Sequence, residues 1–406
     1  MSVLTTNYLT PTGREEAWRF TPLKRLRGLH DGVAVQSDRQ SLISKGTLPA
    51  GVSFTRENLE PLAASDDVII ERIRGAATSV AHLAIAANTE VSEPIFLGRS
   101  AGALDTAEFS RVRITLGTHA VATVIVENTT DTVLAEDLEI NLSPGSNLKF
   151  VTLQEFESQS VYTARHHAVV DKDATFKSVT VTVGGDVVRI LPTVEFTAPG
   201  GSVDLLGVYF ATAGQFFEHR MHVDHAVPNA KSNVNYKGAL AGKDAHTVWI
   251  GDVLIRAAAE GTDTYELNRN LLLSDGARAD SVPNLEIETG QIEGAGHASA
   301  SGRFDNEQLF YLQARGISAD EARRLVVLGF LVDILQRTQV DELVERLTNV
   351  LEEIQKLTKK GISKEELEKA KKIRITAFAL GLQTPQDLMN FYGNQEIMFK
   401  IGAVPH

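Results

Sequence analysis

The sequence predicts a mainly β protein with helical segments on both sides of the β region. From residue 108 onward, short β-branched runs alternate with Gly, Asn, Asp and Ser at a spacing of about ten residues. After Gly302 these runs stop and helical patterns replace them. Many short, evenly spaced strands are typical of a sandwich, a barrel or a β-solenoid. The chain shows no fixed hexapeptide period, so the strand pattern leaves all three open.

Residues 1–100 are mixed in character, and we expect them to form a separate N-terminal region with helices. A short helical segment is expected at 23–29, and residues 63–87 carry apolar side chains at roughly helical spacing. The β region follows, with bounds at 101–302. Its expected strands cover residues 112–116, 122–126, 138–142, 150–153, 178–183, 193–196, 203–209, 247–255 and 285–288.

A helical region is expected at 303–345. Residues 306–316 form a helical pattern that ends at Gly316, a typical C-terminal cap. Ser318 and Glu321 form a capping box that opens a second helix. Two short helices cannot bury the broad apolar face of this second helix between themselves, so we expect them to dock on the β region, on a partner, or on both. That face consists of Leu325, Val326, Leu328, Phe330, Leu331, Ile334 and Leu335.

The last part of the chain, residues 346–406, differs in composition and is expected to be an extra helical tail. Eight of the 16 lysines lie in residues 356–406, which contain one arginine, Arg374. A solvated helix face accepts either residue, so folding does not require this change. A separate origin for the tail explains it more simply.

Composition excludes several classes of function. The net charge of −12 argues against a nucleic-acid or anionic-membrane partner, because both need a basic surface. The sequence shows neither a membrane span nor a signal peptide, so we expect a cytoplasmic protein. The chain has no cysteine, which excludes disulfides, a thiol nucleophile and thiolate metal ligands. It therefore cannot hold an iron–sulfur cluster by the usual four cysteines.

The densest polar cluster lies at 218–225. His222 and Asp224 would face one side of a strand and His225 the other. Two histidines and a carboxylate suit a metal, but hydrogen-bonded strand residues are the alternative. The zinc-peptidase pattern H-x-x-E-H fails at Gln215, which stands where the first ligand belongs. Neither a Walker A motif nor a Gly-x-Ser-x-Gly elbow is present.

His297 lies alone among the small residues 294–302, which we expect to form a loop between the last strand and the first C-terminal helix. The small flanking residues leave such a histidine sterically accessible. The alternative is a loop histidine without a role. The residues themselves leave both interpretations open.

Several separated segments resemble the SufB/SufD family of iron–sulfur cluster assembly proteins. The matching segments are residues 222–225, 236–238, 262–274, 277–281, 283–287 and 306–316, together with His297, and they follow the family's order and spacing. Residues 14–23 are similar to the opening of the SufD branch. The resemblance covers about residues 1–345. It implies a right-handed parallel β-helix flanked by N-terminal and C-terminal helical regions, and so selects the solenoid among the three folds.

The resemblance also implies a function. The chain would be a non-catalytic scaffold subunit that pairs with SufB through the ends of their β-helices and docks the SufC ATPase through its C-terminal helices. The docking residues would be Leu309, Phe310, Tyr311, Leu312, Leu325, Phe330 and Ile334. His297 would lie at the SufB interface as a transient ligand in cluster assembly, while Ala295 stands where some relatives have cysteine. No cofactor would be stably bound, although an iron–sulfur cluster could form transiently at that interface.

Two other interpretations concern the tail and the fold. Residues 351–371 and 389–393 resemble part of an insulinase-type (pitrilysin family) metallopeptidase, without its catalytic site. A natural fusion, an artefact and a misassembled reading frame all fit, and we favour an origin without function. The alternative functions are a β-helical carbohydrate-active enzyme, which needs paired carboxylates that we cannot place, and an inactive peptidase-fusion protein. A SufB paralogue is disfavoured by the absent cysteines.

Overall fold

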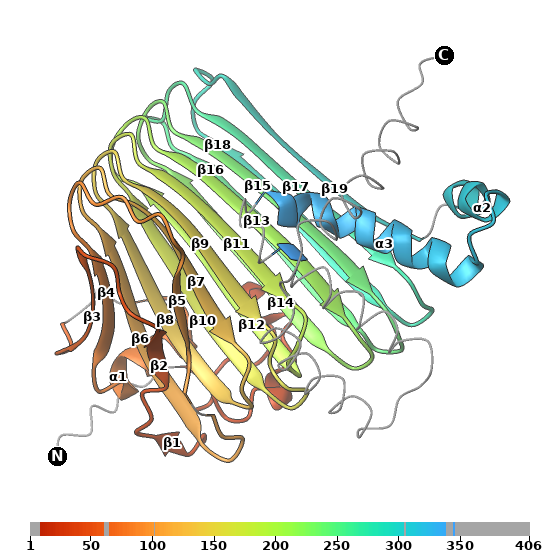
Figure 1. Cartoon of the computed structure of the whole chain (residues 1–406), viewed down its shortest axis with the longest axis horizontal. Coiled ribbons are helices and arrows are strands. Elements are labelled where there is room, and N and C mark those ends of the chain that lie inside the picture. The colour runs from red at the N-terminus through yellow and green to blue at the C-terminus, as the bar shows by residue number, and fades with distance from the viewer. Residues whose placement is uncertain (1–8, 61–64, 101, 304–305, 338–343, 346–406) are drawn as a thin grey trace. The chain divides into compact units, whose positions relative to one another are not determined.

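Two sheets enclose a common interior and form a parallel β-helix (Figure 1). The structure is a computed structural model and describes residues 9–60, 65–100, 102–303, 306–337 and 344–345. Successive strands alternate between the sheets, so most strands pair with the strand two places along the chain. The turns therefore stack in chain order, as the colours of Figure 1 show. The fold expected from the family resemblance is confirmed.

Within the described residues, sheet A has 10 strands and sheet B has 9. Sheet A contains β1 (Gln36–Ser37), β3 (Val52–Glu57), β4 (Val80–Ile85), β6 (Ala107–Leu116), β8 (Val133–Leu142), β10 (Val161–Val170), β12 (Val187–Phe196), β14 (Phe216–His225), β16 (His246–Ile255) and β18 (Arg278–Ile287). Sheet B contains β2 (Leu42–Lys45), β5 (Ile95–Arg99), β7 (Val121–Asn128), β9 (Asn147–Gln154), β11 (Thr175–Thr182), β13 (Ser202–Ala211), β15 (Lys231–Leu240), β17 (Asp263–Leu272) and β19 (Gly294–Arg303). The short strands β2 and β3 pair antiparallel with β5 and β4.

The repeat of the β-helix is uneven in length. Ala107 pairs with Val133 in sheet A, whereas His246 pairs with Arg278, which is further along the chain. The loops absorb this difference, because β14, β16 and β18 each keep a length of 10 residues. An uneven repeat explains why the sequence shows no fixed period.

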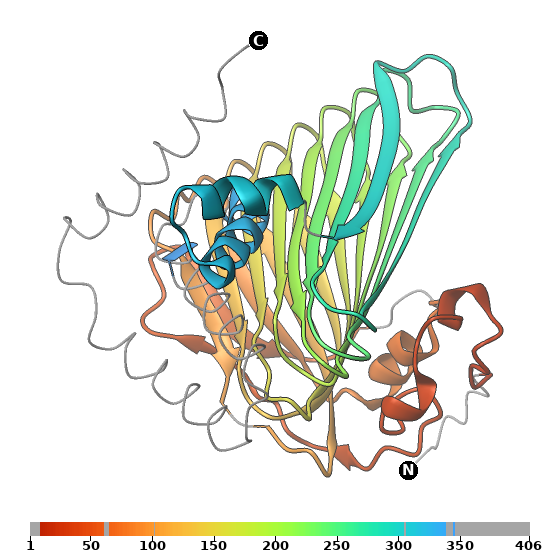
Figure 2. The same ribbon diagram turned by 90° about the vertical axis from the view of Figure 1, so that its right-hand side faces the viewer.

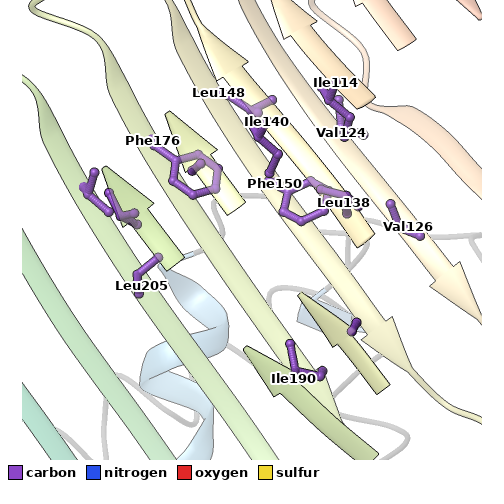
Figure 3. Packing of buried hydrophobic residues seen from close by; sticks show 14 of the residues in the cluster. Ile114, Val124, Val126, Leu138, Ile140, Leu148, Phe150, Phe176, Ile190 and Leu205 are labelled. Carbon is purple, nitrogen blue, oxygen red and sulfur yellow. The ribbon is translucent and has the colours of Figure 1, made fainter. Parts of the chain in front are cut away.

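The core fills the space between the two sheets. Every second side chain of a strand faces this interior, as the strand geometry requires. Ile114, Leu138 and Ile140 from sheet A meet Val124 and Phe150 from sheet B, and all five are buried (Figure 3). Burying apolar side chains of this size contributes about 1.5 to 3 kcal/mol each. The interior packing therefore holds the stack of turns together.

The N-terminal segment covers part of the outer face of sheet A. It contains two short 3-10 helices, η1 (Glu16–Trp18) and η2 (Leu23–Arg25), and the helix α1 (Val68–Ala76). Apolar side chains of this segment form a second core with outward-facing residues of sheet A: Trp18, Leu26, Leu29, Ile69, Ile70 and Ile73 against Val133, Ala135, Val161, Val187, Phe216 and Val248. Asp67 caps α1 by accepting hydrogen bonds from the backbone amides of Ile69 and Ile70.

The helical spacing expected over residues 63–87 is only partly correct. The helix α1 ends at Ala76, and β4 begins at Val80 and pairs with β6. The segment Val80–Ile85 has buried and half-buried residues in near alternation, which fits a strand, and sheet pairing takes precedence there over the local pattern. Strands of both sheets thus begin before residue 101.

The C-terminal helices are α2 (Asn306–Ala314) and α3 (Ala319–Gln336). As expected, α2 ends before Gly316, whose φ of +86° suits glycine, and the Ser318 hydroxyl accepts a hydrogen bond from the Glu321 amide. The helix α3 contacts β13 and β15 on the outer face of sheet B (Figure 2). There the Lys237 ammonium lies 2.6 Å from a carboxylate oxygen of Asp333. The expectation that these helices dock on the β region is confirmed for α3.

Among the described residues, no helix is both long and apolar enough to span a membrane. The predicted tail at 346–406 lies outside the described residues.

Candidate functional site

In the described part of the chain, no further turn covers the inward-facing side chains of the last turn of the β-helix. The strands β18 and β19 end their sheets, and each has one neighbour in the described part of the chain, β16 and β17 respectively. Inward-facing side chains of earlier turns are buried, whereas those of β19 are largely exposed, namely His297, Ser299, Ser301 and Arg303. We call this surface the open end.

His297 lies on a strand and not in a loop, so that expectation is wrong. Residues 294–303 form β19, which pairs with β17 along its whole length despite its small residues. Among them, Gly296 leaves room for its neighbour, because a Cβ there would lie 3.2 Å from the Tyr265 ring. His297 occupies the same face as Ala295, which packs against the core, and its side chain is exposed at the open end.

Glu266 is the register neighbour of His297, on β17. Its side chain faces the interior and is fully buried, and neither carboxylate oxygen has a hydrogen-bond partner among the described residues. Burial, with a smaller contribution from the Asp252 carboxylate, raises the pKa of Glu266 to about 8. The space it needs is kept by Gly251, where a Cβ would lie 2.7 Å from Oε1 of Glu266 and 2.6 Å from the Trp249 ring.

Glu266 was not predicted as a site residue from the sequence, although the sequence contains a pattern that includes it. Thr264, Glu266, Asn268 and Asn270 recur at every second position of β17, with buried side chains. A polar series at period two marks one face of a strand. The sequence alone does not show which face of β17 is inside, so this polar series is interpreted as an ordinary solvated face.

Polar groups next to Glu266 and His297 are joined by hydrogen bonds. The Tyr209 hydroxyl donates to Asn270 over 2.6 Å, and the Asn268 amide donates to Tyr209 over 2.9 Å. Two residues of the last turn join this network: Ser281 donates to Asn268 over 2.8 Å, and Asn270 donates to Ser301 over 3.2 Å. The open end is therefore connected to polar groups inside the β-helix.

The network continues inward through stacked rings. Tyr209 stacks on His219, with ring centroids 5.2 Å apart, and the Thr182 hydroxyl lies 3.0 Å from Nε2 of His219. Burial lowers the pKa of His219 to about 3, so its imidazole stays neutral at pH 7. A neutral, buried histidine serves here as a hydrogen-bonding and packing group.

The polar cluster at 218–225 does not form a metal centre. The Asp224 carboxylate pairs with Arg256 at 2.8 Å, while His225 faces the interior, where Nε2 lies 2.8 Å from the Ser232 hydroxyl. His222 is exposed on the outer face. The described residues contain no group of three or more His, Asp or Glu suited to a metal. The structure thus favours the hydrogen-bonded alternative.

The expected docking residues differ in exposure. Phe310 and Tyr311 on α2 are 73% and 47% exposed. Leu312 is buried against Ala322, and Ile334 is fully buried. Leu325 and Phe330 are half-buried on α3, where the Phe330 ring centroid lies 5.2 Å from the Lys237 ammonium, and the side chain of Leu309 lies outside the described residues.

Comparison with known proteins matches residues 96–330 to the SufBD core domain of the SUF system for FeS cluster assembly. An iron–sulfur cluster assembly SufBD family protein of Mycobacterium bovis is 45% identical over 352 residues, covering 84% of this chain and 88% of the relative. One from Mycobacterium leprae is 42% identical over 351 residues, covering 84% and 90%. The iron–sulfur cluster assembly protein SufD of Escherichia coli is 23% identical over 373 residues, covering 83% and 87%.

The fold and the open end define a parallel β-helix protein whose last turn presents a histidine beside a buried carboxyl group. The chain belongs to the SufBD family of iron–sulfur cluster assembly proteins. The expected likeness of residues 346–406 to an insulinase-type metallopeptidase finds no support in these comparisons.

Proposed function

We propose that this chain is the SufD-type subunit of a cytoplasmic SufBCD complex, a non-catalytic scaffold on which iron–sulfur clusters are assembled as cargo. The observation that carries the proposal is the open end, where two 10-residue edge strands and His297 are exposed together. The likeness to Escherichia coli SufD supports the choice of subunit.

Pairing with SufB uses the edges of β18 and β19. An edge strand presents a row of unpaired backbone N–H and C=O groups that a second β-helix can extend. The pairing would bring His297 to the interface, where its imidazole serves as a transient ligand or proton acceptor. Because this chain has no cysteine, the thiolates for the cluster come from SufB.

Docking of SufC uses the C-terminal helices. Phe310 and Tyr311 are the exposed aromatic side chains of α2, and Arg315 lies over the Tyr311 ring at 4.6 Å. Aromatic residues with a neighbouring arginine are typical of interface hot spots. The ATPase activity of the complex belongs to SufC, so this chain needs no nucleotide motif of its own.

The test is co-expression of the chain with SufB and SufC, followed by sizing of the purified complex. We expect a stable complex from the full chain and an F310A/Y311A variant that keeps SufB and loses SufC. The Leu9→Ala variant is the control, because Leu9 is an exposed apolar residue outside α2. A parallel preparation without residues 346–406 shows whether the tail obstructs SufC.

A second measurement addresses His297. The His297→Ala complex should assemble normally and yield less cluster after reconstitution with iron and sulfide. A full cluster yield from that complex contradicts the role of His297, and a chain that elutes alone contradicts the scaffold function.

A further inference from the structure

The chain contains two Asp-Gly pairs, Asp31-Gly32 and Asp275-Gly276. An aspartate before glycine isomerises readily, because glycine has no Cβ to hinder the attack of its amide nitrogen on the side-chain carboxyl carbon. The attack needs a side chain that can turn and an amide nitrogen that is not held in a hydrogen bond. The two pairs share the same chemistry, so the fold decides which of them reacts.

Several contacts hold the first pair in place. The Gly32 amide donates to the Gly28 carbonyl over 3.0 Å, and the Val33 amide donates to the Asp31 carboxylate over 3.2 Å. The Asp31 side chain is 33% exposed. The guanidinium of Arg72 fills the space that a Cβ at Gly32 would occupy. Ring closure at Asp31 would therefore have to break two hydrogen bonds and displace Arg72.

The second pair lies in the turn between β17 and β18, beside the open end. The Ala277 amide donates to the Ser274 carbonyl over 3.4 Å, so Asp275 and Gly276 are the central residues of this turn. The φ of Gly276 is +82°, which a turn of this kind requires at its second central residue. Both residues are exposed, and the Asp275 side chain is 90% exposed. The Gly276 amide makes no hydrogen bond to any of the described residues.

The other contacts of this turn leave the reacting atoms free. The Gly276 carbonyl accepts a hydrogen bond from the Asp244 amide over 3.1 Å, and its own amide is not involved. The Asp275 carboxylate lies 3.0 Å from the guanidinium of Arg303, whose side chain is 73% exposed. Water competes for both groups of such an exposed ion pair, so it holds the Asp275 side chain only weakly.

We propose that Asp275 is a site of spontaneous isoaspartate formation in the folded protein, whereas the fold protects Asp31. The Gly276 nitrogen forms a bond to Cγ of Asp275. The amide proton and the hydroxyl of the protonated carboxyl group leave as water, and a five-membered succinimide results. Water then opens the ring at either carbonyl, which gives an aspartyl or an isoaspartyl linkage. No electron is transferred, and water is the only co-reactant.

The isoaspartyl linkage changes the path of the main chain. It routes the backbone through Cβ and Cγ of Asp275, so the turn that joins β17 to β18 becomes one carbon longer. This turn leads directly into β18, an edge strand of the open end. The modification itself is a property of this chain alone, and only its effect on pairing with a partner rests on the proposed function.

The experiment incubates the full-length chain in H₂¹⁸O at pH 7.4, once folded and once unfolded in guanidinium chloride. Each passage through the succinimide incorporates one ¹⁸O atom, which peptide mass spectrometry locates. An isoaspartate-specific carboxyl methyltransferase with S-adenosylmethionine measures the isoaspartyl product. In the folded chain, we expect Asp275 to take up label about tenfold or more faster than Asp31, because native hydrogen bonds slow the reaction at Asp31. In guanidinium chloride, the two rates should agree within about threefold, since both native environments are lost.

Asp275→Glu is the matched variant. Glutamate keeps the charge but would have to close a six-membered ring, which forms far more slowly, so the label at residue 275 should disappear and that at Asp31 should stay the same. Label at Asp31 that equals or exceeds label at Asp275 in the folded wild type would overturn the proposal, as would a folded chain without label at Asp275. Both pairs are measured in one molecule, so the result does not depend on folding of the variant. Failure of the complex to assemble would refute the scaffold function and leave this result unaffected.

Discussion

The guanidinium carbon of Arg189 lies 4.0 Å from the ring centroid of Trp18, between the outer face of sheet A and the N-terminal segment. Arg189 also donates to the Asp67 carboxylate over 2.8 Å and lies 3.8 Å from Glu218, and its side chain is 1% exposed. One buried cation therefore links η1, the cap of α1 and β12. This arrangement makes the attachment of the N-terminal segment sensitive to a single residue.

We expect Arg189→Met to destabilise the protein by about 3 to 5 kcal/mol, because it leaves buried carboxylates without their cation. Urea unfolding measures the loss, and limited proteolysis should show earlier cleavage within residues 9–60. The control is Arg269→Met, since Arg269 is exposed on the outer face of β17 and should change stability by less than about 0.5 kcal/mol. An unchanged urea midpoint in Arg189→Met contradicts the linking role.

Three interior histidines should make the protein sensitive to acid. Burial lowers the pKa values of His166 and His225 to about 4 and that of His219 to about 3. The unfolded chain takes up these protons below pH 6.5 while the folded chain does not, so stability is present above pH 6.5 and is lost as the pH falls toward 4. Each histidine should lower the free energy of unfolding at pH 5 by an amount on the order of 2 kcal/mol relative to neutral pH.

Urea midpoints measured from pH 7.5 to 5 test this expectation. His225→Gln should lessen the decline, whereas His222→Gln, which changes an exposed residue, should leave it as in the wild type. If the urea midpoints of the wild type and His225→Gln fall in parallel with pH, the burial of His225 does not contribute to the loss of stability in acid.

Glu266 should have the opposite pH dependence. Its pKa in the folded chain is raised from 4.5 to about 8, so the folded state holds the proton more tightly than the unfolded state. The stability that protonated Glu266 provides is complete below pH 4.5 and is lost as the pH rises toward 8, by an amount on the order of 3 to 5 kcal/mol. Glu266→Gln should therefore be more stable than the wild type at pH 8.5, as measured by thermal unfolding. A wild type that matches Glu266→Gln at both pH 6 and pH 8.5 contradicts the raised pKa.

Lys237 and Asp333 should respond unequally to substitution, although they form one ion pair. The Lys237 side chain is 11% exposed and that of Asp333 is 40% exposed. Asp333→Asn leaves a buried ammonium without its partner, whereas Lys237→Met leaves a carboxylate that water can reach. We expect faster hydrogen exchange over residues 319–336 in Asp333→Asn than in Lys237→Met. Equal exchange in the two variants would mean that the burial of Lys237 carries no cost.

Local rules predicted the apolar strands and the helix ends well. Runs such as 138–142 and 203–209 lie inside β8 and β13, and Ser318 caps α3 as its spacing indicates. These features depend on neighbouring residues, whose preferences can be read directly. The N-terminal pattern at 63–87 failed because β4 gains its hydrogen bonds from β6, a strand distant in sequence.

The site was less predictable, for the same physical reason. Gly294–Arg303 has the composition of a loop, and only pairing with β17 makes it a strand. His297 was recognised through the family resemblance, whereas Glu266 depends on knowing which face of β17 is inside. The order of strands in the two sheets determines which face of β17 is inside, and no short stretch of sequence contains this information.

The two ends of the β-helix differ, and this difference limits assembly. At one end, β2 and β3 are short and run antiparallel to their neighbours, while β18 and β19 at the other end are 10-residue parallel strands. Short edge strands are poor templates for another chain. A molecule with long unpaired edge strands at both ends would polymerise into filaments. A molecule with long edge strands at one end can pair with only one partner there. The fold thus favours closed pairs over open-ended growth.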